Sequence, residues 1–103
     1  MRCGWVVEIK ADMIERYKLL HSNAWTQINH QIKECNIHDY SIFLTPCLNG
    51  KHYLFGNYTY AGHDLKQDLA KMSEDPCTQE WWKLTGPCQV GEWQPLEEVY
   101  YLQ

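Results

Sequence analysis

Several of the simplest sequence signals are missing from this chain of 103 residues. It has no run of Lys or Arg and a formal net charge of −4, which argues against nucleic acid as a partner. No apolar stretch approaches the roughly 20 residues that a membrane-spanning helix needs. Near the N-terminus, Glu8 and Lys10 interrupt the apolar segment too early for a secretory signal peptide. These absences predict a cytoplasmic protein that contacts neither membrane nor nucleic acid.

The usual patterns of metal and redox sites are missing as well. The five cysteines include no Cys-x-x-Cys pair, and the five histidines include no His-x-x-x-His or HExxH pattern. This spacing argues against a zinc ribbon and a thioredoxin-type site, and it fits reduced thiols in the cytosol. We expect neither a metal nor a cofactor, although a metal site assembled from distant positions stays open.

Phenylalanine is scarce, with two residues, whereas the chain has five Trp and seven Tyr. Trp and Tyr combine a flat apolar face with a hydrogen-bonding edge, so they suit sugar-binding surfaces and oligomer interfaces as well as cores. The length predicts one domain over residues 1–103, with a single hydrophobic core.

Hydrophobic periodicity and turn residues predict alternating strands and helices. The expected strands cover residues 3–9, 37–45, 52–60 and 96–102; the expected helices cover about 12–22, 25–35, 63–72 and 76–85, with a turn at 48–50 and a loop over 86–95. The resulting order, β-α(α)-β-β-α(α)-β, is that of the ferredoxin-like βαββαβ sandwich. In this α+β fold, helices cover one face of a four-stranded antiparallel sheet. Its other face would be bare in a monomer, so we expect a homodimer.

Local signals mark the ends of these helices. An Asp12–Glu15 capping box should start the first helix. That helix should break near Ser22 and Asn23, which are good N-cap residues and could restart it. Asn36 should end the second helix, and Asp75 should cap the fourth, with Pro76 at its first position. In the third strand, Gly56 indicates a bulge or a close backbone approach.

The first helix carries the first candidate site residues. Tyr17 and His21 are four residues apart, so they project from the same side of the helix, and Trp25 would continue the row. A phenol, an imidazole and an indole on one face are typical of the wall of a polar pocket. The structural alternative is a set of half-buried aromatic rings whose polar tips are satisfied, and spacing alone does not exclude it.

Several blocks of the chain resemble the L-rhamnose mutarotases, a family of small dimeric ferredoxin-like proteins of the α/β-barrel type. The matching blocks follow one another over nearly the whole chain: Tyr17-Lys-Leu-Leu-His21, Ala24-Trp25, His38-Asp-Tyr40-Ser-Ile-Phe-Leu44, Trp81-Trp82-Lys83 and Leu96-Glu-Glu-Val-Tyr-Tyr-Leu102. The resemblance implies that His21 acts as the proton donor and that Tyr17 contacts the sugar. It also implies that Tyr40, Trp81 and Trp82 line the same pocket.

The activity that this resemblance implies is interconversion of the α and β anomers of a 6-deoxy-hexose, with L-rhamnose ahead of L-fucose. Ring opening needs a base at the anomeric hydroxyl and an acid at the ring oxygen, and closure reverses both transfers. Imidazole suits this work because its ordinary pKa is about 6.5. The chemistry requires no cofactor or metal. The second proton-transfer group stays open among Tyr17, Asp39, Glu97 and Glu98.

Other interpretations of these residues and of this fold stay open. Adjacent helical residues point about 100° apart, so at most one of Trp81 and Trp82 should face a pocket squarely, and both could be core residues. Tyr40 shares its strand face with apolar neighbours and could also be structural. The alternative functions are a non-catalytic sugar-binding or regulatory module and a small dimeric ferredoxin-like monooxygenase.

Overall fold

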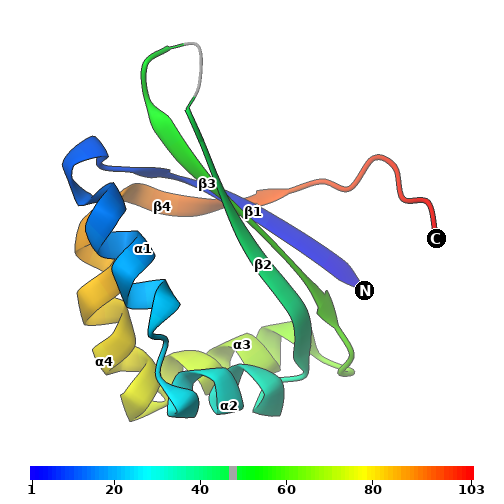
Figure 1. Cartoon of the computed structure of the whole chain (residues 1–103). Coiled ribbons are helices and arrows are strands. Elements are labelled where there is room, and N and C mark those ends of the chain that lie inside the picture. The colour runs from blue at the N-terminus through cyan, green and yellow to red at the C-terminus, as the bar shows by residue number, and fades with distance from the viewer. Residues whose placement is uncertain (47–48) are drawn as a thin grey trace.

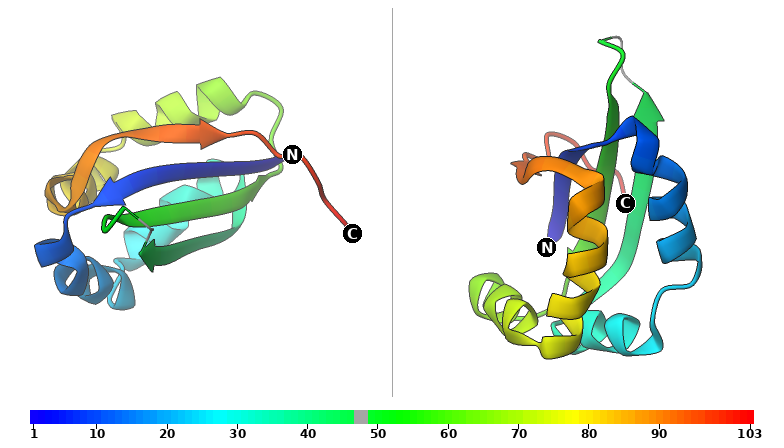
Figure 2. Two further views of the ribbon diagram at one scale, coloured as in Figure 1. Left: turned by 90° about the horizontal axis from the view of Figure 1, so that it is seen from above. Right: turned by 90° about the vertical axis from the view of Figure 1, so that its left-hand side faces the viewer.

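The computed structural model describes residues 1–46 and 49–103 (Figure 1). Its elements are β1 (Arg2–Ile9), a 3-10 turn (Ala11–Met13), α1 (Ile14–Ser22), α2 (Thr26–Glu34), β2 (Ile37–Pro46), β3 (His52–Tyr60), α3 (Leu65–Glu74), α4 (Pro76–Thr85), a second 3-10 turn (Gly86–Cys88) and β4 (Gln89–Leu96). The strands form one antiparallel sheet in the order β2-β3-β1-β4. The helices lie on one side of this sheet, which confirms the predicted ferredoxin-like α+β class (Figures 1 and 2).

The core lies between the sheet and the helices. Trp5, Val7 and Ile9 alternate along β1 and are buried, as expected for the inner face of a strand. They pack with Tyr17 of α1 and Leu54 of β3. Within the described residues, none of the helices combines the length and the apolarity that crossing a bilayer requires.

The predicted break between the first two helices is confirmed. The hydroxyl of Ser22 and the amide of Asn23 donate to the carbonyl of Leu19, at 2.9 and 3.3 Å, so they close the end of α1 rather than starting α2. Asn36 follows α2 with a φ of 64° and ends that helical segment as predicted. The turn expected at residues 48–50 begins at Leu48, outside the described residues.

The capping box predicted at Asp12 and Glu15 is wrong. The backbone N–H of Met13 donates to the carbonyl of Lys10 at 2.9 Å and closes a 3-10 turn, so α1 begins only at Ile14. Asp12 therefore lies inside that turn and makes no side-chain cap bond.

The predicted cap of α4 is confirmed. Asp75 accepts hydrogen bonds from the backbone N–H and the hydroxyl of Thr78, at 2.8 and 2.9 Å, and Pro76 occupies the first helical turn. The cap satisfies an N–H group that has no partner inside the helix, and it fixes the start of the helix that carries both neighbouring tryptophans.

The prediction for the C-terminal region is wrong. The fourth strand is β4, which apart from Leu96 lies in the stretch expected to be a loop, whereas residues 97–103 belong to no strand or helix and are exposed. Figure 1 shows this last segment leaving the sheet as an extended tail.

Gly and Pro residues in β4 explain the error. β4 is an edge strand, where Pro95 is tolerated because one side of the strand has no hydrogen-bonded neighbour. Gly91 adopts a φ of 75°, and the pairing of β4 with β1 shifts its register between Val6 and Glu8. These residues mark a bulged edge strand.

A second bulge shapes β2. Its register with β3 shifts between His38 and Ser41, and Asp39 has a φ of 51°. The extra residue brings Tyr40 to the inner face that Ile37 also occupies, since side chains otherwise alternate along a strand. The bulge therefore delivers Tyr40 to the space between sheet and helices.

Candidate functional site

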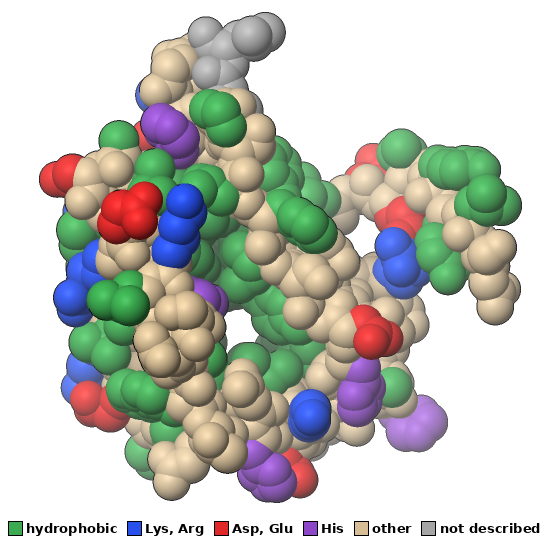
Figure 3. Space-filling view, viewed as in Figure 1, with side chains coloured by type: hydrophobic (Ala, Val, Ile, Leu, Met, Phe, Trp, Pro, Cys, Tyr) green, Lys and Arg blue, Asp and Glu red, His purple; other side chains and the backbone are tan. Residues whose placement is uncertain are grey.

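A cavity of about 880 Å³ lies between the helices and the inner face of the sheet. In the space-filling view, apolar side chains line this hollow (Figure 3). Its volume falls within the range of about 300–1,000 Å³ that is typical of small-molecule sites. The structure brings together in its walls all five residues predicted from the sequence: Tyr17, His21, Tyr40, Trp81 and Trp82.

His21 and Tyr17 lie on the same side of α1, as their spacing predicts. Their rings stack with centroids 4.1 Å apart and an interplanar angle of 28°. The Nδ1 atom of His21 lies 2.9 Å from the backbone carbonyl oxygen of Tyr17. A carbonyl oxygen can only accept, so Nδ1 carries a hydrogen, and in the neutral ring Nε2 carries the lone pair.

The environment separates the proton affinities of these two side chains. Burial lowers the pKa of His21, and the hydrogen bond to the Tyr17 carbonyl only partly opposes this effect. Burial raises the pKa of Tyr17 to about 12. Near neutral pH the imidazole is therefore neutral and the phenol keeps its proton, so a proton acceptor and a proton donor lie side by side.

The two neighbouring tryptophans of α4 occupy different positions. Trp81 is 7 % exposed, and its ring lies edge-on to those of His21 and Trp25, with both centroid separations at 5.3 Å. Trp82 is 38 % exposed and also lines the cavity. The angular argument from the sequence is consistent with this arrangement, because one indole packs against the imidazole while the other remains accessible to solvent.

Tyr40 enters the cavity from the opposite wall, on β2. The indole Nε1 of Trp5 donates to its hydroxyl at 2.9 Å, and burial raises its pKa, so the phenol stays protonated. Trp5 fits there because Gly56 has no side chain: a Cβ at that position would lie 2.1 Å from Cε2 of Trp5. The sequence predicted a bulge or a close backbone approach at Gly56; the strand register there is regular, and the ring of Trp5 is what lies against this glycine.

Three further residues of the wall were not predicted from the sequence. Trp93 of β4 stacks on Trp5 with centroids 4.3 Å apart and an interplanar angle of 6°, and its Nε1 donates to Oε1 of Gln89 at 2.9 Å. Gln89 also lines the cavity. The sequence placed Trp5 only within the first expected strand. Gln89 and Trp93 lie in the stretch whose Gly and Pro residues suggested a loop.

The other candidates for the second proton-transfer group lie outside the cavity. Asp39 and Glu97 are exposed, and Glu98 accepts a hydrogen bond from Arg2 at 2.8 Å. Of the four candidates, Tyr17 is the one beside His21. Across residues 1–46 and 49–103, no group of three or more His, Cys, Asp and Glu side chains is placed to hold a metal ion.

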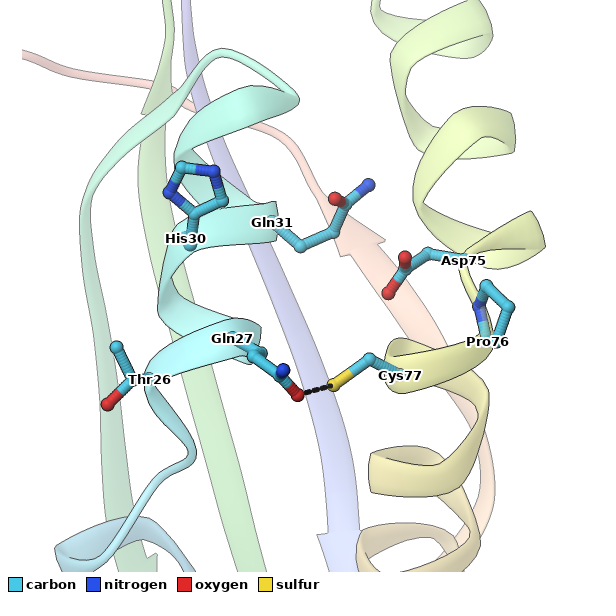
Figure 4. A pocket seen from close by; sticks show the side chains of 7 residues that line it. All are labelled: Thr26, Gln27, His30, Gln31, Asp75, Pro76 and Cys77. Carbon is cyan, nitrogen blue, oxygen red and sulfur yellow. Dashed lines mark hydrogen bonds between the residues drawn. The ribbon is translucent and has the colours of Figure 1, made fainter.

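A second, shallower cleft of about 550 Å³ lies between α2 and the start of α4 (Figure 4). Gln27 and Cys77 point toward each other across it, and the Cys77 thiol donates to Oε1 of Gln27 at 3.5 Å. Asp75 borders the cleft, but its carboxylate already caps α4. None of the residues predicted for the site lies there, so the candidate site is the large cavity.

Comparisons with known proteins bear on this site. A family model described as L-rhamnose mutarotase matches residues 2–102. The L-rhamnose mutarotase of Oceanobacillus iheyensis is 30 % identical over 86 residues, which cover 84 % of this chain and 77 % of that protein. The chain belongs to the L-rhamnose mutarotase family.

Solved structures agree with this family assignment at the level of the fold. The crystal structure of an L-rhamnose mutarotase from Formosa agariphila matches with a TM-score of 0.80 and 19 % identity, covering 100 % of this chain and 99 % of that one. A candidate antibiotic biosynthesis monooxygenase from Nitrosomonas europaea matches with a TM-score of 0.60 and 16 % identity, covering 97 % and 100 %. At these identities the likeness shows the fold alone. Membership of the L-rhamnose mutarotase family makes the chain a sugar mutarotase, an isomerase, and the monooxygenase and non-catalytic alternatives are not favoured.

Proposed function

We propose that the protein interconverts the α and β anomers of L-rhamnose, with L-fucose as the second candidate, and that His21 is its proton-transfer residue. The observation that carries this proposal is the imidazole of His21 in the cavity wall, with Nδ1 bound to a backbone carbonyl and Nε2 left for substrate. Relatives named L-rhamnose mutarotase support the choice of sugar.

The mechanism follows from the neutral state of this ring. Nε2 of His21 takes the proton of the anomeric hydroxyl as the bond from C1 to the ring oxygen breaks, and a second group protonates the ring oxygen. The aldehyde end then turns about the C1–C2 bond. On closure the imidazolium returns its proton to the former carbonyl oxygen, so His21 is the proton donor of the closing step. General acid–base catalysis of this kind accelerates a reaction by roughly 10²–10⁴-fold.

The aromatic residues of the cavity suit a deoxysugar. The indoles of Trp81 and Trp82 offer flat apolar faces to one side of a pyranose ring and to its 6-methyl group. The hydroxyl of Tyr40 accepts from Trp5, which leaves its own hydrogen for a sugar oxygen. In this proposal Tyr17, Tyr40, Trp81 and Trp82 bind the substrate.

Saturation-difference NMR tests the proposed activity. L-Rhamnose, L-fucose and D-galactose are equilibrated in turn, one anomeric proton is saturated, and transfer to the other anomer is followed with and without protein. We expect protein-dependent exchange for L-rhamnose first and L-fucose second. Binding of the sugars without faster exchange would instead identify a binding module, and no exchange with any of the three would overturn the proposed activity.

The pH dependence of exchange follows from the lowered pKa of His21. Burial stabilises the neutral ring, so its lone pair should persist below the ordinary histidine pKa of about 6.5. Enzyme-dependent exchange should therefore stay constant on acidification to about pH 6.5 and fall only below it, as Nε2 is protonated. The exchange rate is measured by NMR from pH 5 to 8 in steps of about half a pH unit. The rate of the sugar without protein is subtracted at each pH. A rate that rises on acidification would show the imidazolium to be the active form.

We propose in addition that two copies of the chain associate through the outer face of the sheet. The strand register places Phe43, Phe55 and Val6 in one row across that face. Phe43 is 61 % exposed, and the exposed tail adds further apolar side chains such as Val99 at 86 %. Exposed apolar surface of this kind marks an interaction site. The same surface on a second copy of the chain can cover it in a symmetric dimer.

A charged residue on this face should prevent the association. F43D should convert a dimer of about twice 12.3 kDa into a monomer in sedimentation velocity, because the new carboxylate would be buried without a partner. L19D is the matched control, since Leu19 is similarly exposed, at 66 %, but lies on α1, on the helical side of the sheet. A wild-type chain that sediments as a monomer at micromolar concentration would refute the dimer.

The protein's cellular location is part of the same proposal. Cys3, Cys35, Cys77 and Cys88 are free thiols, which fits the reducing cytoplasm. Cytoplasmic location would place the enzyme with the free sugar after uptake. Fractionation of cells that express the tagged chain tests it.

A further inference from the structure

The large cavity continues past the predicted site residues, toward α2 and α3. The helices α1 and α4 cover one end of the sheet, and α2 and α3 cover the other (Figures 1 and 2). At this second end, apolar side chains from three elements line the cavity: Ile28 and Ile32 of α2, Leu65, Leu69 and Met72 of α3, and Ile37 of β2. We call this part of the cavity the apolar compartment.

Two separate hydrophobic clusters mark the two ends of the cavity. The first contains Tyr17, on whose ring His21 stacks. The second contains Ile37 and packs against apolar residues of α2 and α3. Tyr40 and Tyr58 pack against both clusters, with ring centroids 5.4 Å apart, so they stand at the junction. The apolar compartment therefore lies beyond this tyrosine pair, at the end away from the imidazole.

The chain itself does not fill the apolar compartment. Leu65, Leu69 and Met72 follow one another at the spacing that places them on one side of α3. Leu69 lines the cavity and yet is 39 % exposed. Covering such a side chain with an apolar ligand group is favourable, because it removes apolar surface from water.

A single monosaccharide is too small for the whole cavity. L-Rhamnose contains six carbon and five oxygen atoms. Even at roughly 30 Å³ each, the volume of a water molecule in the liquid, these atoms fill at most about 330 Å³. This is less than half of the cavity volume of about 880 Å³. The remainder can hold a group attached to the sugar.

The side chains of this end favour an apolar group. Of the cavity-lining residues that the structure describes, none is Asp, Glu or Lys. The N-terminal amine of Met1 donates to the carbonyl of Tyr60 at 2.9 Å, and the guanidinium of Arg2 donates to Glu98 at 2.8 Å, so both cations are already paired. The polar contribution from α2 is the exposed side chain of Asn29. A charged group would therefore lose water without gaining partners, whereas an alkyl chain has no such cost.

The ring geometry of a pyranose directs one edge toward this compartment. The reacting atoms, C1 and the ring oxygen, must lie at His21, and C3 and C4 lie across the ring from them. We propose that the substrates of this protein include 6-deoxy-hexoses with an apolar group, an alkyl ether or an acyl ester, on O3 or O4, and that the apolar compartment binds this group. This inference rests on the proposed function, because proton transfer at His21 fixes the edge that faces the compartment.

Three propyl ethers of L-rhamnose test the inference on the wild-type chain. The 3-O- and 4-O-propyl ethers carry the chain on the far edge, whereas the isomeric 2-O-propyl ether carries it beside C1. Each fully buried CH₂ group tightens binding roughly fourfold. At least one far-edge ether should therefore bind roughly tenfold or more tightly than L-rhamnose and than the 2-O isomer in titration calorimetry. Saturation-difference NMR should show enzyme-dependent anomer exchange of the same ether.

A charge inside the apolar compartment should abolish this preference. L69D should reduce the ratio of the dissociation constants of L-rhamnose and the far-edge ether from roughly ten to about one, because the carboxylate opposes burial of an alkyl chain. The ratio is measured within one variant, so a general loss of affinity does not imitate the effect. L19D is the matched control: Leu19 is exposed on α1 and does not line the cavity, so the ratio should stay at the wild-type value. If L69D does not fold, the comparison of the isomers on the wild-type chain decides.

Two results would overturn the inference. One is that neither far-edge ether binds more tightly than the 2-O isomer, and the other is that L69D and L19D have the same ratio. Both leave the proposed activity standing, provided that the wild-type chain accelerates the anomer exchange of L-rhamnose. Absence of that exchange would instead remove the proposed activity itself.

Discussion

Replacing His21 with alanine should lower enzyme-dependent anomer exchange by about 10²–10⁴-fold, the usual contribution of a positioned acid–base group. The imidazole is the cavity group with a lone pair available near neutral pH and a tautomer set by the Tyr17 carbonyl. Sugar binding should persist, because Trp81, Trp82 and Tyr40 remain in the wall. Saturation-difference NMR reports both quantities on one sample.

H30A is the control for this substitution. His30 is an exposed residue of α2, 3.5 Å from Glu34 and outside the large cavity, so its loss should leave exchange unchanged. A thermal melt of H21A verifies that the variant is folded at the temperature of the assay. An exchange rate in H21A within about tenfold of the wild-type rate would contradict a catalytic role for this imidazole.

Substituting alanine at Gly56 should both destabilise the fold and impair the site. The added Cβ would lie 2.1 Å from Cε2 of Trp5, and this ring cannot move freely because it stacks on Trp93 and hydrogen-bonds Tyr40. Overpacking of this kind typically costs about 1–3 kcal/mol of unfolding free energy. Each kcal/mol lowers the melting temperature by roughly 4–8 °C in a chain of this size. Displacement of Trp5 should also release Tyr40 and weaken sugar binding.

G86A provides the matched comparison. Gly86 has a φ of −55°, and a Cβ there would meet no atom within 4 Å. The substitution should therefore leave the melting temperature unchanged or raise it slightly, because alanine restricts the unfolded chain more than glycine does. If calorimetry found equal melting temperatures for G56A and G86A, the contact between Gly56 and Trp5 would not constrain the wall of the cavity.

Much of the fold and of the site follows from short-range patterns. The spacing of Tyr17 and His21 predicts that they share one side of a helix, as observed. The β-branched and aromatic residues of 3–9 predict the first strand. The glycine in the third strand marks a crowded position, where a missing side chain makes room for the ring of Trp5 rather than for a bulge. These features depend on helix and strand geometry alone, which a single sequence expresses directly.

Other features depend on neighbours that the sequence does not specify. Gly91 and Pro95 act as strand breakers in isolation, yet at a bulged edge of the sheet they are compatible with β4. The contribution of Gln89 and Trp93 to the site was therefore missed with the strand that carries them. In the same way, Asp12 and Glu15 form a capping pattern, but the hydrogen bond from Met13 to Lys10 shifts the start of α1.

The irregular backbone at Asp39 determines which side chains of β2 point into the cavity and which point to the outer face of the sheet. Counted from Ile37, a regular strand would direct Tyr40 outward and Phe43 inward, the reverse of what is observed. Loss of one residue at this point would exchange the side chains that line the cavity for those that we expect to meet the second subunit. Because side chains alternate between the two faces of a strand, the single inserted residue Asp39, in a left-handed conformation, decides which side chains of β2 face the cavity and which face outward.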